Sequence, residues 1–216
     1  MKIFLLGGTG KTGYEVLKQL VDRKYSITAL VRNPLGFNLD GIEEAKRQQV
    51  TIVKGSALDK DTLEDKMGKC DLVISILGTG TKNEYTEIYS EGGRNILEAM
   101  RIKGVKKLIT ITSGLIDMSD PSTDNFFLNR IIRPNFNKIY YDQTRWETIL
   151  DDTKDIEWMC VRPTYLTNGD PTGDYRVKER HCPIGGRKIR RSDLADFIIK
   201  QISPEPFIYK KPVLAY

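Results

Sequence analysis

The sequence predicts an α/β fold in which a doubly wound, mainly parallel sheet carries helices on both faces. Short, mainly apolar runs, such as residues 3–6 (IFLL) and 72–77 (LVISIL), alternate with segments whose apolar residues recur at helical spacing. Such runs are typical of parallel strands buried on both faces, and their alternation with helices is typical of α/β folds. The 216 residues suffice for one such domain and are too few for a second, so we expect a single domain over residues 1–216.

A glycine-rich turn joins the first predicted strand to the first predicted helix. This glycine turn, residues 7–13 (GGTGKTG), is followed directly by apolar residues at helical spacing. Glycines leave backbone amides unhindered, and the start of a helix adds the positive end of its dipole, so the turn can hold a phosphate. It therefore predicts a Rossmann-like dinucleotide site, with a merely tight strand-to-helix connection as the alternative. The candidate phosphate-binding residues are Gly7, Thr9, Gly10, Lys11, Thr12 and Gly13.

The end of the glycine turn, Gly10-Lys11-Thr12, also resembles the end of a triphosphate-binding loop. That loop requires a glycine at position 5, which is Leu5 inside the strand. It also requires a later strand that ends in aspartate, to help hold magnesium. The strands that end near residues 77 and 112 run into Gly78 and Ser113 instead. We therefore do not expect a nucleotide triphosphatase.

Arg32 follows the second predicted strand, residues 27–31. In a Rossmann unit this strand end approaches the adenosine ribose, where an acidic residue would accept hydrogen bonds from the 2′-hydroxyl of NAD. An arginine instead suits the 2′-phosphate of NADP, because its planar guanidinium offers a fork of donors. We therefore predict NADP(H) as the cofactor, with Lys11 as a second positive charge. The alternative is that Arg32 lies in an ordinary surface turn.

Two later strands lead into small polar residues at the same edge of the sheet. Residues 72–77 lead into Gly78 and Thr79, and the switch-point rule predicts the middle of the cofactor here. Residues 107–112 deliver Ser113 to the same edge. The segment after this strand loses clear periodicity, which is typical of a loop that carries function. We expect walls of an acceptor site from about residues 114–137 and 164–186.

The remaining stretches predict further helices and strands. Helices are expected around residues 42–48 and 61–67, over residues 84–103 and 138–151, and after Ser192 or Asp193, one of which should cap the last helix. Strands are expected at residues 50–53, 156–161 and 207–214. The pair Gly92-Gly93 costs its helix roughly 1 kcal/mol per glycine relative to alanine, and close packing against the sheet or the cofactor would explain it.

Composition narrows the classes of function. The net charge is +5 and the pI is near 9.0, but the basic clusters are short and lack interleaved aromatic residues, so nucleic-acid binding is not favoured. The three cysteines form no C-x-x-C pair, and the single histidine leaves little room for a metal site or a serine-histidine-aspartate triad. Because no apolar run is long enough for a signal peptide or a membrane span, we expect a cytoplasmic protein without a membrane partner.

Several stretches together carry a family resemblance. They occur in family order: residues 7–13, Leu30-Val31-Arg32, Leu77-Gly78-Thr79, residues 90–96 (SEGGRNI), Thr112-Ser113-Gly114 and Arg162-Pro163. Together they resemble the atypical short-chain dehydrogenase/reductases with NmrA-like NAD(P)H-binding domains. The type that the chain resembles most is the biliverdin-IXβ reductase/flavin reductase type, which residues 167–175 and the chain length also resemble.

The resemblance implies a single-domain, NADPH-dependent reductase that transfers hydride to a flat conjugated acceptor, such as a flavin, a quinone-like molecule or a linear tetrapyrrole. By position, the glycine turn would hold the pyrophosphate and Arg32 the 2′-phosphate. The other positions are Ser56 and Ala57 beside the adenine, Leu77, Gly78 and Thr79 along the nicotinamide, Pro163 at the strand exit, and Ser113 near the transferred hydride. Tyr165 stands where the biliverdin type has a histidine, and Ser56 stands where the family usually has an aspartate.

The tyrosine-x-x-x-lysine dyad of the wider superfamily is absent. Tyr141 is followed four residues later by Arg145, and Tyr140 by Thr144. Reduction of a carbonyl requires a proton donor for the developing alkoxide, whereas a conjugated acceptor spreads the charge itself. The absence of the dyad therefore favours a conjugated acceptor and argues against an epimerase or a dehydratase. A non-catalytic NADP(H)-binding redox sensor with a protein partner is a further alternative, and Ser113 and Tyr165 remain the candidate catalytic residues.

Overall fold

A central sheet runs through the protein in the computed structural model, which describes residues 1–80, 83–124, 126–203 and 206–216. Its strands are β1 (Lys2–Leu6), β2 (Ser26–Val31), β3 (Val50–Lys54), β4 (Leu72–Ser75), β5 (Lys107–Ile111), β6 (Glu157–Pro163), β8 (Arg176–Lys178) and β10 (Val213–Ala215). Their order is β3-β2-β1-β4-β5-β6-β10-β8, and only the β10–β8 pair is antiparallel. Strands β7 (Tyr165–Thr167) and β9 (Lys188–Arg190) form a separate small sheet. The predicted fold class is confirmed.

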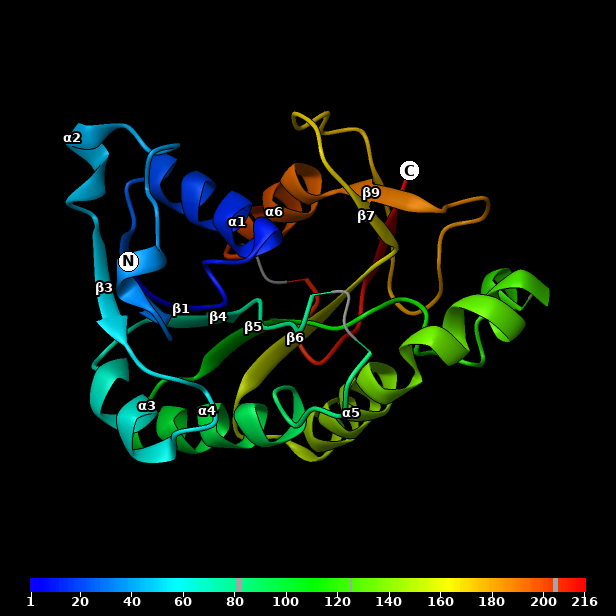
Figure 1. The fold of residues 1–216 in the computed structure, drawn as a ribbon, viewed down its shortest axis with the longest axis horizontal. Helices are drawn as coiled ribbons and strands as arrows, with labels where there is room; N and C mark the ends of the chain where they lie inside the picture. The colour runs from blue at the N-terminus through cyan, green and yellow to red at the C-terminus, as the bar shows by residue number, and fades with distance from the viewer. Residues whose placement is uncertain (81–82, 125, 204–205) are drawn as a thin grey trace.

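Helices cover both faces of this sheet (Figure 1). Helices α1 (Lys11–Asp22) and α6 (Arg191–Lys200) lie on one face, and α3 (Lys60–Met67), α4 (Ser90–Lys103) and α5 (Arg133–Asp152) lie on the other. Each face has its own apolar core, with Leu17 and Leu20 of α1 in one and Ile96 and Trp146 in the other. The short α2 (Glu44–Arg47) and the 3₁₀ turn η1 (Pro34–Gly36) lie between β2 and β3 in the sequence.

Helix α4 begins later than predicted, at Ser90 rather than at residue 84. Its start is fixed from α5, because the buried carboxylate of Asp142 accepts hydrogen bonds from the backbone N–H groups of Tyr89 (2.9 Å) and Ser90 (3.3 Å). The glycine pair is explained by packing. A Cβ on Gly93 would lie 2.4 Å from the ring of Trp146, so the second glycine allows α4 and α5 to approach each other closely.

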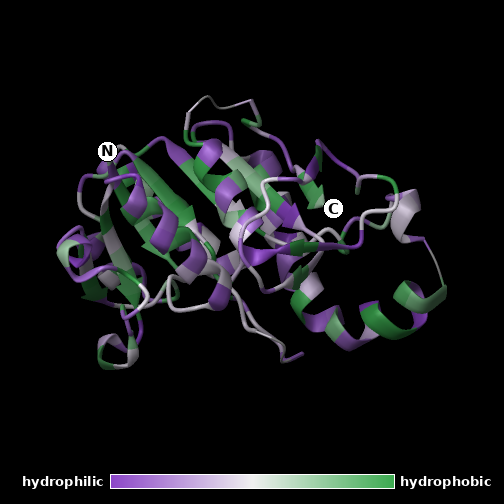
Figure 2. Ribbon diagram, turned by 90° about the horizontal axis from the view of Figure 1, so that it is seen from above, coloured by the Kyte–Doolittle hydropathy of each residue, from purple (hydrophilic) through white to green (hydrophobic). Residues whose placement is uncertain are grey.

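The segment over residues 115–137 is not irregular throughout, which corrects the prediction. Helical structure begins at Phe126, continues as a π-helix over Leu128–Ile132 (η3) and merges with α5. Pro134 lies in the first turn of α5, directly after the π-helix, at the junction of the two helical types. Figures 1 and 2 show this end of the helix projecting from the body of the protein.

The cap predicted for the last helix is also wrong. Helix α6 follows Arg190 without a side-chain capping bond. The Asp193 carboxylate instead accepts the backbone N–H groups of Thr172 (2.8 Å) and Gly173 (2.7 Å), so it fastens a distant loop. The predicted strand over residues 207–214 is reduced to β10.

Candidate functional site

The predicted site residues gather along one edge of the sheet. The parallel registers pair Leu6 with Leu30 and with Ser75, so the carboxyl ends of β1, β2 and β4 lie side by side. The carboxyl ends of β5 and β6 continue this edge, and the Gly114 N–H donates to the Pro163 carbonyl over 3.0 Å. The fold thus brings together the residues that follow these strands.

The three spaced glycines of the glycine turn meet different surroundings. Gly7 has φ +78°, and a Cβ there would lie 2.2 Å from the Ile76 carbonyl oxygen. A Cβ on Gly13 would lie 2.1 Å from the Gly7 carbonyl oxygen. Gly10 is exposed, and its nearest neighbour would lie at 3.4 Å. Gly7 and Gly13 are therefore needed for packing, whereas Gly10 leaves open space where a ligand can approach.

The first turn of α1 is suited to an anion. Its N-cap is Gly10, which has no side chain to bond the first amides, and no acidic residue lies in the first turn. Lys11 and Thr9 are exposed there, while Thr12 is buried. Unsatisfied amides at a helix start and the positive end of the dipole both attract a phosphate. The residues present therefore fit the pyrophosphate of a dinucleotide.

Arg32 lies directly after β2 and is exposed. Among the described residues no carboxylate lies within 4.0 Å of its guanidinium, and no hydrogen bond holds it. The loop behind it is anchored, because the Tyr14 hydroxyl accepts the Gly41 N–H over 2.9 Å. The Phe37 ring also lies 3.7 Å from the position of a Cβ on Gly8. Arg32 is thus an unpaired cation beside an ordered loop.

The residues predicted along the adenine and the nicotinamide lie at the ends of β3 and β4. Ala57 is buried, and its carbonyl accepts from the Asn95 amide over 2.9 Å. The Ser56 hydroxyl accepts the Leu58 N–H over 3.2 Å. Leu77 is half-buried and Gly78 exposed, while the buried Thr79 hydroxyl has no hydrogen-bond partner within the part of the chain that the structure describes.

Ser113 is accompanied by Tyr140, which the sequence analysis did not select. Burial raises the pKa of Tyr140, and the neighbouring Ser113 hydroxyl opposes that rise. Tyr141 is 65% exposed and points away from the buried side of α5. Residue 144, four residues after Tyr140, is a threonine and offers no ammonium group; its hydroxyl donates to the Tyr140 carbonyl over 2.9 Å.

The helical periodicity of α5 indicates, from the sequence alone, that Tyr140 lies closer to the buried side of the helix than Tyr141 does. The buried positions of the helix form a stripe at helical spacing, and from the middle of the helix onward they are Ile139, Asp142, Gln143, Trp146, Glu147 and Leu150. Residue 140 borders this stripe and residue 141 lies outside it. The two tyrosines are therefore distinguished by helical periodicity alone.

Pro163 and Tyr165 behave differently at the exit of β6. Pro163 is buried beside Gly114, so it lies close to Ser113. The side chain of Tyr165 is 75% exposed, and its backbone is held in β7, where its N–H donates to the Arg187 carbonyl over 3.2 Å. Within the described part of the chain, the exposed Tyr165 therefore has no partner that would orient its hydroxyl.

The two predicted walls contact each other. The Asp120 carboxylate accepts the Cys182 N–H over 2.7 Å, and Arg180 donates to the Ser119 hydroxyl over 3.2 Å. Burial alone would raise the pKa of Asp117, but hydrogen bonds from Ser119 and the charge of Arg162 outweigh it and lower that pKa to about 2. Asp117, in the first wall, is thus an ionised carboxylate held by hydrogen bonds.

Buried arginines attach the first wall to the scaffold. Arg162 pairs with Asp117 (2.9 Å) and, through Nε, with Glu147 of α5 (2.9 Å). The Arg133 guanidinium donates to the Leu115 carbonyl (3.1 Å) and to the Thr123 hydroxyl (2.9 Å). These contacts fix the wall relative to Ser113, which lies at its start.

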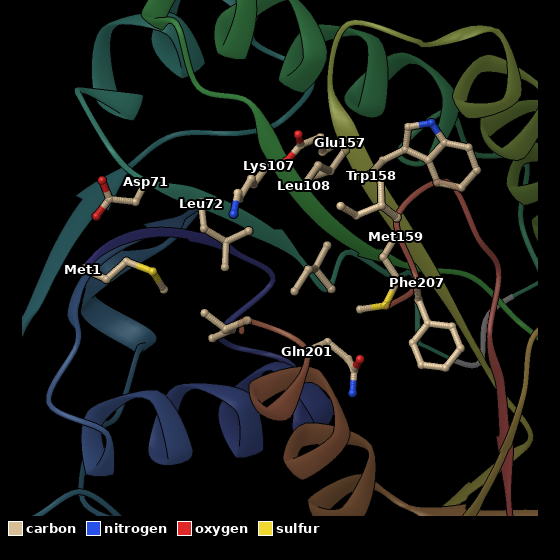
Figure 3. Close-up of a pocket in the computed structure, with 13 residues that line it drawn as sticks. Met1, Asp71, Leu72, Lys107, Leu108, Glu157, Trp158, Met159, Gln201 and Phe207 are labelled. Carbon is tan, nitrogen blue, oxygen red and sulfur yellow. The ribbon is translucent and has the colours of Figure 1, made fainter. Parts of the chain in front are cut away.

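A cavity of about 150 Å³ lies at the opposite edge of the sheet (Figure 3). It is lined by residues at the amino ends of β4, β5 and β6, such as Leu72, Leu108 and Met159, together with Gln201 and Phe207. None of the predicted site residues lines it. The cavity is therefore separate from the edge that carries the glycine turn.

Residues 7–205 match the model of a family described as NAD(P)H-binding. The chain belongs to this family. Membership confirms the predicted resemblance to NmrA-like, atypical short-chain dehydrogenase/reductases at the level of family and of NAD(P)H binding. Among the described residues no helix is long and apolar enough to cross a membrane.

Solved structures of other proteins share the fold of this family member. A wide-type short-chain dehydrogenase/reductase from Veillonella parvula in complex with NADP superposes with a TM-score of 0.81 at 14% identity, over 100% of this chain and 94% of that one. The anaerobillin reductase ChuY from Escherichia coli O157:H7 gives 0.74 at 19% identity, over 100% and 97%. SP1627 from Streptococcus pneumoniae TIGR4, proposed to be an NADH-flavin reductase, gives 0.77 at 18%, over 100% and 99%.

Proposed function

We propose that this NAD(P)H-binding protein is an NADPH-dependent oxidoreductase that reduces a flat conjugated acceptor. The observation that carries the proposal is the cation at the end of β2, because Arg32 is exposed and unpaired where the adenosine ribose is expected. The glycine turn would hold the pyrophosphate, and Ser56 and Ala57 would lie beside the adenine. Leu77, Gly78, Thr79 and Pro163 would contact the nicotinamide half.

An apolar acceptor is supported by the exposed side chains of the two walls. The described residues include thirteen exposed large hydrophobic side chains, and six of them lie in the walls: Met118, Phe126, Phe127, Ile131, Tyr165 and Ile184. Flat conjugated molecules bind chiefly through such surfaces. Of the structural neighbours described above, one is named as an anaerobillin reductase and the other is proposed to be an NADH-flavin reductase.

NADPH would supply the hydride. The chain's own residues would orient the acceptor or the nicotinamide and would protonate the acceptor. The Ser113 hydroxyl would position the acceptor or the nicotinamide at the sheet edge. Tyr140, whose pKa is raised by burial, keeps its proton at neutral pH and is available as a donor through Ser113. Among the described residues, the charged group that opposes the rise in this pKa is Arg133 rather than a lysine, and the pair suits an acceptor that needs little help with protonation. Buried Pro163 would help to exclude water from the edge.

An acceptor screen tests this function. NADPH oxidation would be followed spectrophotometrically with FMN, riboflavin, quinones, dichlorophenolindophenol and biliverdin. Turnover with one of these acceptors, lowered in Ser113→Ala more than cofactor affinity is lowered, supports the proposal. Tight NADPH binding without oxidation by any acceptor would refute catalysis and favour the redox-sensor alternative.

Arg32→Ala tests the cofactor. A charge-assisted hydrogen bond contributes roughly 1.5 to 3 kcal/mol, and about 1.4 kcal/mol corresponds to tenfold in affinity. Wild type should therefore prefer NADPH over NADH by about one to two orders of magnitude, and the variant should lose most of this preference through weaker NADPH binding. Arg23→Ala is the control, because Arg23 is exposed at the other end of α1. Equal affinity of wild type for both cofactors would contradict the assignment.

A further inference from the structure

We propose that Lys54 is a second residue that selects the 2′-phosphate of the cofactor, acting beside Arg32 from the neighbouring strand. The inference rests on the proposed function, because it concerns the same cofactor. Lys54 is the last residue of β3 and is exposed. The sequence analysis assigned it no role.

The sheet register brings Lys54 next to Arg32. Lys54 is paired with Val31 in the parallel ladder between β2 and β3, and the Gly55 N–H donates to the Val31 carbonyl over 3.0 Å. Adjacent strands lie about 4.8 Å apart. Arg32 directly follows Val31, so the two cations leave neighbouring strands at the same edge.

The side chain of Lys54 belongs to the face of the sheet that α1 covers. Val50 packs against the core cluster that contains Leu17 of α1, and residues 50, 52 and 54 of a strand share one face. Paired residues in register also project to the same side, so Lys54 and Val31 share that face. The glycine turn, at the start of α1, lies on this side as well (Figure 1).

The loop that follows Arg32 is held against the same strand. Turn η1 packs beside β3, and the loop is fastened further along by the hydrogen bond between Tyr14 and Gly41. Arg32 and Lys54 thus stand on an ordered frame, which lowers the entropy that a ligand must remove to engage both.

The lack of carboxylate partners at Arg32 and Lys54 also supports a role for Lys54 in phosphate binding. Other lysines of this half are paired, such as Lys46 with Asp22 (2.9 Å) and Lys60 with Glu98 (2.7 Å). Within the described part of the chain, neither Arg32 nor Lys54 has a carboxylate within 4.0 Å or a hydrogen bond from its side chain. A phosphomonoester, with a charge of about −1.5 to −2, held at these adjacent strand ends would attract both cations.

Lys54 could instead protect an edge strand from pairing with other chains, and this role predicts no effect on cofactor affinity. Strand β3 is an edge strand of the sheet, and lysine on an edge strand discourages pairing with other chains. A residue that serves only this purpose would not affect cofactor affinity. Replacing it would instead increase self-association.

The experiment compares ligands with and without the 2′-phosphate on folded protein. Affinities of NADPH, NADH, 2′,5′-ADP and 5′-AMP would be measured by calorimetry for wild type, Lys54→Met, Arg32→Ala and the double variant. Lys54→Met should weaken NADPH and 2′,5′-ADP by about three- to tenfold and leave NADH and 5′-AMP unchanged. Lys69→Met is the matched control, because Lys69 is exposed before β4 at the other edge of the sheet.

The outcomes separate this inference from the proposed function. If Arg32→Ala abolishes the preference for NADPH and Lys54→Met does not change it, the inference is wrong and the cofactor assignment stands. If wild type shows no preference for NADPH, both are wrong. Equal weakening of all four ligands by Lys54→Met would also overturn the inference, because it would indicate a structural effect. Lys54→Glu should weaken 2′,5′-ADP further than Lys54→Met does.

Discussion

Gly10→Ser should make the protein more stable and its cofactor binding weaker. Gly10 has φ −76° and ψ 155°, a conformation open to any residue, and a Cβ there would have its nearest neighbour at an ordinary 3.4 Å. A serine at this N-cap can accept a backbone N–H of the first helical turn, which no side chain does in the wild type. The same amides are those that we propose bind the pyrophosphate.

Gly10→Ser should raise the stability of the protein and lower its affinity for NADPH. Better capping and the lower backbone entropy of the unfolded chain should add about 0.5 to 1 kcal/mol to the free energy of unfolding. For a chain of this size that corresponds to a rise in Tm of about 1 to 4 °C without ligand. The added side chain would compete with the phosphate for charge-assisted hydrogen bonds, so NADPH should bind at least about tenfold more weakly.

The assay is thermal unfolding without ligand, followed by NADPH titration of the same samples. Gly13→Ala is the contrasting variant, because its Cβ would lie 2.1 Å from the Gly7 carbonyl oxygen. Relief of that clash must move the backbone, so this variant should lose about 1 to 3 kcal/mol of stability as well as cofactor affinity. If Gly10→Ser binds NADPH as tightly as wild type, the glycine turn does not hold the pyrophosphate.

Two further predictions concern the acceptor side. Tyr140→Phe should lower kcat by about tenfold or more and leave NADPH affinity unchanged, whereas Tyr141→Phe should be nearly silent; steady-state kinetics with the best acceptor distinguishes them, and the reverse order would contradict the assignment of Tyr140. Asp117→Asn should destabilise the protein at neutral pH and lose this effect in acid. A carboxyl whose folded pKa is lowered from 3.8 to about 2 contributes stability above pH 3.8 that disappears as the pH falls through that interval. Urea unfolding at both ends of the interval checks this, and a constant difference between variant and wild type would refute it.

The sequence predicted those parts of the protein that depend on local pattern. The apolar runs and the glycine spacing yielded the strands, the order of helices and the edge at which Gly7, Arg32 and Ser113 collect. These features follow from periodicity and turn chemistry within short windows. They are the features that the sheet registers and the family match bear out.

The misses involve contacts between residues far apart in the sequence. Asp193 was expected to cap its own helix, but its carboxylate bonds the backbone at Thr172 and Gly173. The start of α4 is set by Asp142, more than fifty residues later. No local rule reports which distant group will satisfy a buried carboxylate or a helix start.

The dyad spacing alone did not distinguish Tyr140 from Tyr141. Both residues match a superfamily spacing equally poorly, so the motif could not rank them. Burial ranks them at once, because Tyr140 lies against Ser113 while Tyr141 is exposed. A helical-wheel argument built on Trp146 and Leu150 would have made the same choice before the structure was known.

The position of β10 affects the order in which the strands of the main sheet can assemble during synthesis. Strand β10 lies between β6 and β8, although β8 precedes it in the sequence. During synthesis from the N-terminus, β1 to β5 and the glycine turn emerge before β10 exists, and β8 has no partner in the main sheet until then. The strands β1 to β5 and the glycine turn are therefore synthesised before residues 164–186 can be anchored in the main sheet.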